Sequence, residues 1–89
     1  MDQFVLWGTY CKDALEKRIP FRAEHLQRLS SLKKEGTLVT LGPTKCNRHV
    51  FGIFKAEEIG YVRSLIKEDI YWKKGIWTDF EIYSWTQAF

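Results

Sequence analysis

Four stretches of the chain have the apolar patterning of β-strands. Residues 4–10 and 37–41 are dominated by β-branched, aromatic and aliphatic side chains, and residues 48–55 contain four large apolar ones. The fourth stretch, residues 76–85, has two apolar faces, with Ile76, Phe80 and Ile82 on the first and Trp77, Tyr83 and Trp85 largely on the second. Each stretch predicts one strand of a sheet.

Two intervening segments have the periodicity of amphipathic helices. The first runs from about residue 20 to Glu35, with Pro20 in its first turn and Gly36 just beyond its end, where glycine commonly stops a helix. The second begins at residues 56–58, whose two acids suit the positive end of a helix. The apolar stripe of this second helix consists of Ile59, Val62, Leu65 and Ile66.

The remaining segments connect these elements. Residues 11–19 are polar and predict a loop, and residues 68–75 predict a connector that is unusually rich in aromatic side chains. The resulting order is β-α-β-β-α-β, which is the ferredoxin-like pattern of an α+β protein. It predicts an antiparallel sheet with both helices on one face.

The first strand is apolar on both of its faces. Phe4 and Leu6 lie on one face, whereas Val5 and Trp7 lie on the other. Because the two helices can cover only one face, something else must cover the second. A second copy of the same sheet, related by a two-fold axis, is the simplest cover. We therefore expect a homodimer of the kind formed by dimeric α+β barrels.

Composition narrows the class of protein. The 89 residues suit one domain over residues 1–89, and the net charge of +3 is spread among acids rather than gathered in a basic block. These features predict no nucleic-acid partner. No signal peptide or membrane-spanning run is visible, so we expect no membrane partner and a cytoplasmic location. Cys46 and His49 lack a second pair of ligands, so no metal is expected.

His25 is out of place on the predicted helix of residues 20–35. At 3.6 residues per turn it shares a face with Phe21, Leu29 and Leu32, the face expected to lie against the sheet. An imidazole there needs a hydrogen-bond partner, because burying an unpaired polar group costs free energy. Spacing alone leaves two interpretations open, a satisfied core histidine and a functional one.

An ordered set of short motifs covers nearly the whole chain. These motifs are Asp13-Ala14-Leu15-Glu16-Lys17-Arg18, Arg22-x-x-His25-Leu26, Glu35-Gly36-x-Leu38 and Gly42-Pro43. Together they resemble the YCII-related (YciI-like) family, which implies the fold of the dimeric α+β barrel superfamily. The resemblance also implies a catalytic pair, in which His25 matches the family's histidine and Asp69 matches an aspartate that follows the second helix.

The chain departs from the family pattern at two places. Ile70 stands where the family usually has a proline after the aspartate, which predicts a less rigid loop around Asp69. Residues 44–47 are also shorter than the corresponding segment of many relatives, which leaves little room for a lid over a pocket.

The chemistry implied by the pair is cofactor-free proton transfer on a small organic substrate, as in an isomerase or a lyase. An aspartate beside an imidazole fixes its tautomer, so that the ring can take and give a proton. Arg22, one turn before His25, would bind a substrate carboxylate or else form a surface ion pair. Tyr71 and Trp72 would wall a pocket or else belong to the core or to a dimer interface.

Two other functions stay open at this point. A domain of the same fold could bind a small ligand or a protein partner without catalysis. Residues 48–54 also resemble the third-strand motif of single-stranded RNA binders, but no glycine precedes Phe51 and Ile53 replaces a stacking aromatic. RNA binding is therefore the weaker alternative.

Overall fold

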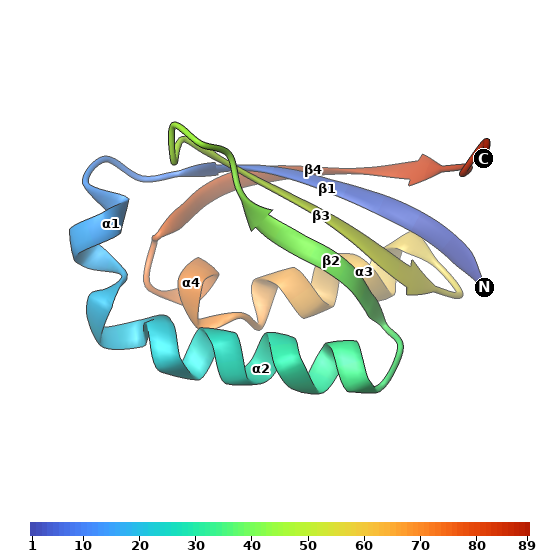
Figure 1. Ribbon diagram of the computed structural model, residues 1–89, viewed down its shortest axis with the longest axis horizontal. Helices are drawn as coiled ribbons and strands as arrows, with labels where there is room; N and C mark the ends of the chain where they lie inside the picture. The colour runs from blue at the N-terminus through green and yellow to red at the C-terminus, as the bar shows by residue number, and fades with distance from the viewer.

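The computed structural model describes residues 1–89, and its elements follow the predicted order with three short additions (Figure 1). The strands are β1 (Asp2–Tyr10), β2 (Leu38–Pro43), β3 (His49–Ala56) and β4 (Trp77–Trp85). The two main helices are α2 (Arg22–Lys34) and α3 (Ile59–Lys67). The additions are α1 (Ala14–Lys17), a 3₁₀ turn (Ile19–Phe21) and α4 (Ile70–Lys73).

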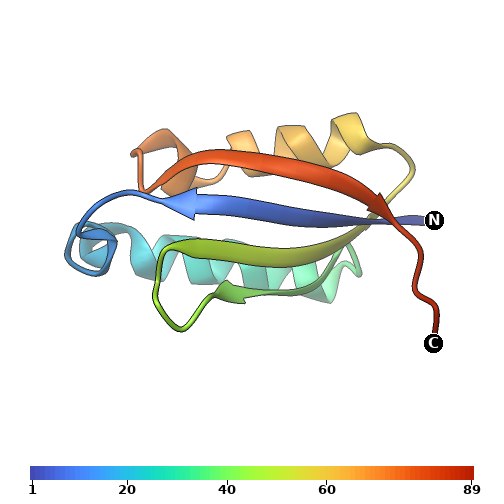
Figure 2. The ribbon, with the colours of Figure 1, turned by 90° about the horizontal axis from the view of Figure 1, so that it is seen from above.

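The four strands form one antiparallel sheet in the order β2-β3-β1-β4. Seen from above in Figure 2, β1 lies between β3 and β4, and the helices lie behind the sheet. In Figure 1, α2, α3 and α4 are all on the same side. The ferredoxin-like arrangement predicted from the sequence is therefore confirmed.

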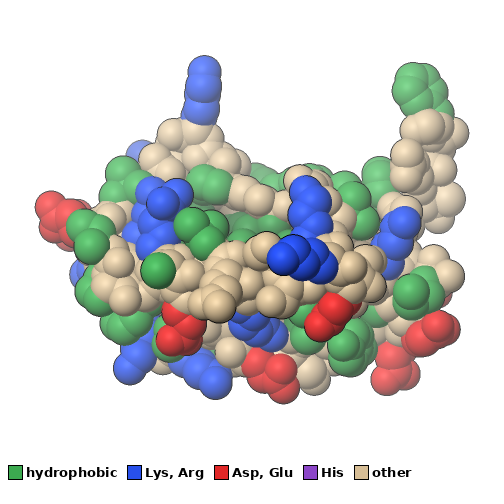
Figure 3. Space-filling view, turned by 60° about the horizontal axis from the view of Figure 1, so that its bottom comes forward, with side chains coloured by type: hydrophobic (Ala, Val, Ile, Leu, Met, Phe, Trp, Pro, Cys, Tyr) green, Lys and Arg blue, Asp and Glu red, His purple; other side chains and the backbone are tan.

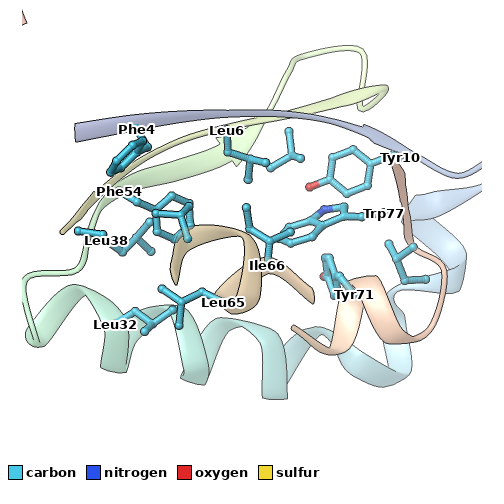
Figure 4. Packing of buried hydrophobic residues seen from close by; sticks show 14 of the residues in the cluster. Phe4, Leu6, Tyr10, Leu32, Leu38, Phe54, Leu65, Ile66, Tyr71 and Trp77 are labelled. Atoms are coloured by element: carbon cyan, nitrogen blue, oxygen red, sulfur yellow. The ribbon is translucent and has the colours of Figure 1, made fainter. Parts of the chain in front are cut away.

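The core fills the space between the sheet and the helices. Alternate residues of β1 and β3, such as Leu6 and Phe54, point into it, and Leu32 of α2 and Ile66 of α3 meet them from below (Figure 4). Gly36 has a φ of 85°, so the predicted glycine stop after α2 adopts the left-handed conformation that favours this residue. The predicted helical face of His25 is also confirmed, since His25 and Leu32 are both buried.

The other face of the sheet is open. It carries an apolar patch across β3, β1 and β4 in which four residues, Trp7, Phe51, Tyr83 and Trp85, are exposed. Val5 lies opposite both Ile53 and Tyr83 in this patch, and Trp85 extends it along β4. We call the six residues Val5, Trp7, Phe51, Ile53, Tyr83 and Trp85 the open-face patch. The two-sided apolar character predicted for the first strand is confirmed.

Three local expectations need correction. The predicted loop of residues 11–19 contains α1, and the predicted connector contains α4. Trp77 does not share a face with Tyr83, because the register shifts between Thr9 and Tyr10, and the extra residue reverses the alternation of β4. Trp77 is buried on the helix side as a result. His49 is half-buried on the open face, where its ring stacks on Trp7.

Charged side chains are dispersed over the surface. In Figure 3, the basic and acidic side chains are interspersed with apolar ones, and neither sign forms a continuous block. This distribution agrees with the weak net charge of +3. Separately, none of the helices has both the length and the apolar character needed to span a membrane.

Candidate functional site

His25 and Asp69 are brought together from separate elements. His25 lies in the first half of α2, and Asp69 immediately precedes α4, 44 residues further along the chain. The Nδ1 atom of His25 is 2.7 Å from Oδ1 of Asp69. Both side chains are buried, with 4% and 1% of their surface exposed. The contact predicted from the family resemblance is therefore present, in a site where water competes little for it.

The Asp69 carboxylate is fixed from three directions. It caps α4, because its Oδ1 accepts the backbone N–H of Tyr71 at 2.9 Å. Its Oδ2 accepts a hydrogen bond from Nη1 of Arg28 at 3.2 Å. The cap holds the carboxylate in place although Ile70, and not a proline, follows Asp69. A carboxylate with this many donors is already satisfied and can only accept from His25.

The imidazole of His25 is clamped between aromatic rings. Tyr71 stacks on it with 3.6 Å between ring centroids and 8° between the planes. Trp77 meets it edge-on at 5.3 Å, and Tyr71 and Trp77 also meet edge-on. Figure 4 shows Tyr71 and Trp77 at one end of the core, together with Tyr10. These contacts fix the plane of the imidazole, so Asp69 selects the tautomer with hydrogen on Nδ1.

A small cavity of about 140 Å³ opens beside the imidazole. Its lining includes Tyr10, Arg18, Arg22, His25, Tyr71 and the end of β2 at Gly42 and Pro43. The volume is well below the roughly 300–1,000 Å³ of pockets for drug-sized ligands, so the cavity fits only a small molecule. A larger hollow near Cys11 and Cys46 lies elsewhere and contains none of the predicted site residues.

Three polar groups on residues that line the cavity have a hydrogen or a lone pair free for a ligand, although the Tyr10 oxygen also faces the indole N–H of Trp77. They are Nε2 of His25 and the hydroxyls of Tyr10 and Tyr71. Burial raises the pKa of both tyrosines, more than the nearby guanidinium groups of Arg18 and Arg22 lower it. Both hydroxyls therefore keep their protons at neutral pH and can donate to a ligand.

Two arginines complete the cavity. Arg22 is exposed and Arg18 is half-buried, and neither takes part in an ion pair. The alternative interpretation of Arg22 as a partner in a surface ion pair is therefore not supported. Arg28, which does form ion pairs, faces Asp69 and Glu68 instead of the cavity.

Trp72 does not belong to the site. Tyr71 and Trp72 follow one another in a single helical turn, so their side chains point to different sides of α4. Trp72 packs edge-on against Phe80 at 5.0 Å and does not line the cavity. The sequence-based assignment of Trp72 to a pocket wall is corrected accordingly, whereas Arg22 and Tyr71 do line the cavity.

Three residues near the pair were not predicted from the sequence. Arg28 follows His25 by three positions and so shares its helical face, a signal that could have identified it. Arg18 lies four residues before Arg22, but the turn between α1 and α2 decides whether it reaches the cavity. Tyr10 enters the site because it ends β1 on the helix side of the sheet.

The arrangement can move a proton. With the hydrogen of the neutral imidazole on Nδ1 and directed to Asp69, the lone pair of Nε2 is free at the cavity. It can remove a proton from a bound molecule, while Asp69 stabilises the imidazolium that results. The cavity lining contains no serine or cysteine that could act as a nucleophile.

Both the sequence and the fold are similar to those of known proteins. The sequence model of the YCII-related domain family matches residues 3–86. The chain is 45% identical over 40 residues to Protein YciI of Escherichia coli O6:H1 and to Protein YciI of Shigella flexneri. The matched segment covers 45% of this chain and 41% of either relative.

Two solved structures share the fold. One is a 5-chloro-2-hydroxyhydroquinone dehydrochlorinase, TftG of Burkholderia phenoliruptrix, in complex with 2,5-dihydroxybenzoquinone; it is 25% identical, with a TM-score of 0.83 over 97% of this chain and 95% of that one. The other is protein Atu4242 of Agrobacterium tumefaciens, 12% identical, with a TM-score of 0.64 over 99% and 94% of the two chains.

Proposed function

The chain belongs to the YCII-related domain family, and we propose that it is an enzyme that uses His25 and Asp69 to transfer protons on a small organic substrate. The observation that carries this proposal is the free Nε2 of His25 at a cavity, with Nδ1 held by a buried carboxylate. A histidine with a purely structural role in the core needs only a hydrogen-bond partner. This one also has an unpaired nitrogen beside space for a ligand.

We propose a chlorinated polyphenol as the substrate, and loss of HCl as the reaction, because the dehydrochlorinase shares the fold over nearly its whole length. His25 takes a hydroxyl proton as a ring C=O forms, and returns it to the carbon that bears chlorine. Loss of a second hydroxyl proton then forms the second C=O and expels chloride. The ring is oxidised as the C–Cl bond is reduced, so the balance requires no cofactor and no external oxidant.

The first test is turnover by the wild-type protein. Incubated with 5-chloro-2-hydroxyhydroquinone, it is expected to release chloride faster than buffer does, since a placed general base contributes about 10²–10⁴-fold to a rate. In D₂O the product should carry deuterium at the carbon that lost chlorine. Chloride electrode readings and mass spectrometry measure both results. Binding without chloride release or deuterium uptake would contradict the enzyme and favour a ligand-binding domain.

We also propose that two copies pack through the open-face patch and that the protein acts in the cytoplasm. The patch is a contiguous set of apolar side chains on three neighbouring strands, and its two-fold pairing would bury both copies at once. Cys11 and Cys46 are both free, which fits a reducing compartment.

Sedimentation at micromolar concentration is expected to give twice the chain mass of 10.6 kDa. Trp7→Glu should shift the protein to monomers, because it places a charge in the apolar patch and directly opposite Glu81. Tyr61→Glu is the matched control, since Tyr61 is equally an exposed aromatic but lies on α3, on the helix side. A monodisperse wild-type monomer would contradict the proposed dimer.

A further inference from the structure

The charges around the cavity have one sign. Two guanidinium groups, those of Arg18 and Arg22, line it, and no carboxylate does. Asp69 offsets them only in part, because it lies outside the lining and is already paired with His25 and Arg28. Burial raises the pKa of the Tyr10 and Tyr71 hydroxyls, and the two guanidinium groups act on both in the opposite direction by smaller amounts. An unpaired positive pair beside a small cavity favours a negatively charged ligand.

Next to Tyr10, outside the cavity lining, lies a buried donor, the indole N–H of Trp77. Nε1 of Trp77 is fully buried and forms no hydrogen bond. Trp77 is the cross-strand partner of Tyr10, and the two rings lie next to each other in Figure 4. A buried N–H without a partner is unfavourable. The Tyr10 oxygen faces this N–H. Burial raises the pKa of Tyr10, and a side-chain contact with Trp77 lowers it by a smaller amount. A phenol hydroxyl has both lone pairs and a hydrogen, so Tyr10 can face the indole with its oxygen and still donate its hydrogen to a ligand. The hydrogen of the Tyr10 hydroxyl is therefore left for an acceptor in the cavity.

We propose that Arg18, Arg22 and Tyr10 form an anion-binding subsite, so that the substrate carries an ionised oxygen, as a carboxylate or as the conjugate base of an acidic enol or phenol. This inference rests on the proposed function, which it deepens by naming the group that orients the substrate. The ionised oxygen lies between the two guanidinium groups and accepts from Tyr10. The reacting end of the same small molecule then faces Nε2 of His25.

Each member of the subsite has a separate part. Arg18 is held in the turn between α1 and α2 and is half-buried, so it can supply a fixed charge with two parallel donors. Arg22 is exposed at the entrance and can attract the anion from solvent. Tyr10 is buried at the end of β1 and supplies a neutral donor at a fixed position. None of these three groups is needed to move the proton, so the subsite can be tested apart from catalysis.

Equilibrium binding of small probes tests the subsite. Benzoate presents a carboxylate, 2,5-dihydroxybenzoquinone presents an ionised enol, and benzamide is the uncharged counterpart of benzoate. Isothermal titration is expected to show one of the two acids binding at least about tenfold more tightly than benzamide, since bonds between charged groups are about twice as strong as neutral ones. The acid that binds more tightly identifies the type of ionised oxygen.

Variants locate the binding in the subsite. Arg18→Gln and Arg22→Gln should each lower the affinity for the acid about tenfold and leave the affinity for benzamide unchanged. Arg63→Gln is the matched control, because Arg63 is an exposed arginine of α3 that does not line the cavity and forms no ion pair. Tyr10→Phe should lower the affinity for the acid by a smaller factor, because it removes a neutral donor. Circular dichroism confirms that each variant remains folded.

The outcomes separate this inference from the proposed function. His25→Ala should retain acid binding, so dependence on Arg18 in the absence of any turnover would support the subsite while the enzyme proposal fails. Turnover in a protein that binds neither benzoate nor 2,5-dihydroxybenzoquinone more tightly than benzamide would support the enzyme and overturn the subsite. The subsite would also be overturned if Arg18→Gln and Arg63→Gln lowered the affinity for the acid equally. Failure of both acids to show saturable binding at millimolar concentration would have the same meaning.

Discussion

His25→Ala is expected to lower the rate of chloride release by about 10²–10⁴-fold, because it removes the only base at the cavity. The loss should fall on kcat more than on KM, since the proposed anion subsite does not include the imidazole. His49→Ala is the matched control. His49 is the other histidine of the chain, but its ring stacks on Trp7 on the opposite face of the sheet. Its removal should leave kcat unchanged.

Asp69→Asn is expected to lower kcat by a smaller factor than His25→Ala. The same oxygen, Oδ1, accepts from both His25 and the Tyr71 backbone, so an asparagine oxygen is favoured at that position. The amide NH₂ would then face Arg28, which is partly exposed and can turn towards Glu68. The tautomer of His25 is preserved in this arrangement, and what is lost is the negative charge that stabilises the imidazolium.

Two results would contradict the catalytic pair. Wild-type turnover by both His25→Ala and Asp69→Asn would show that the substrate reacts elsewhere. Equal losses of rate in His25→Ala and His49→Ala would show that the effect is general rather than local. Either result would leave the buried pair as a structural feature of the core.

The architecture was predictable because it depends on patterns that extend over whole elements. Alternation in residues 4–10 and the helical face that contains Leu29 and Leu32 specify which side of each element is buried. The fate of Trp77 was not predictable in this way. One extra residue in β4 reverses the alternation of its side chains, and the local composition does not predict that shift in register.

The site was only partly predictable for a similar reason. His25 could be noticed from the sequence because it interrupts an apolar stripe, and the family resemblance supplied Asp69. Tyr10 and Arg18 carry no such signal. They reach the cavity because β1 ends on the helix side and because α1 turns the chain back towards α2. Both features depend on the path of a short connection, which periodicity does not specify.

The second large effect is expected on stability. Asp69→Ala should lower the free energy of unfolding by about 3–5 kcal/mol, because each buried donor left without its acceptor costs about 1–3 kcal/mol. Three donors lose their acceptor at once: Nδ1 of His25, the Tyr71 backbone N–H and Nη1 of Arg28. The cap of α4 is also lost, which alone costs about 0.5–2 kcal/mol. The free energy of unfolding of a native protein is only about 5–15 kcal/mol in total, so this loss is a large share of it.

Urea denaturation followed by circular dichroism measures this loss, with Glu68→Ala as the matched control. Glu68 precedes Asp69 and pairs with the same arginine at 3.7 Å, but its side chain is 66% exposed. An exposed pair of this kind contributes only about 0–1 kcal/mol, so the control should unfold close to the wild-type midpoint. Asp69→Asn should fall between the two, because it keeps the cap and the contact with His25. If Asp69→Ala were as stable as Glu68→Ala, the carboxylate would not hold the imidazole, and the basis for a fixed proton acceptor at the cavity would be lost.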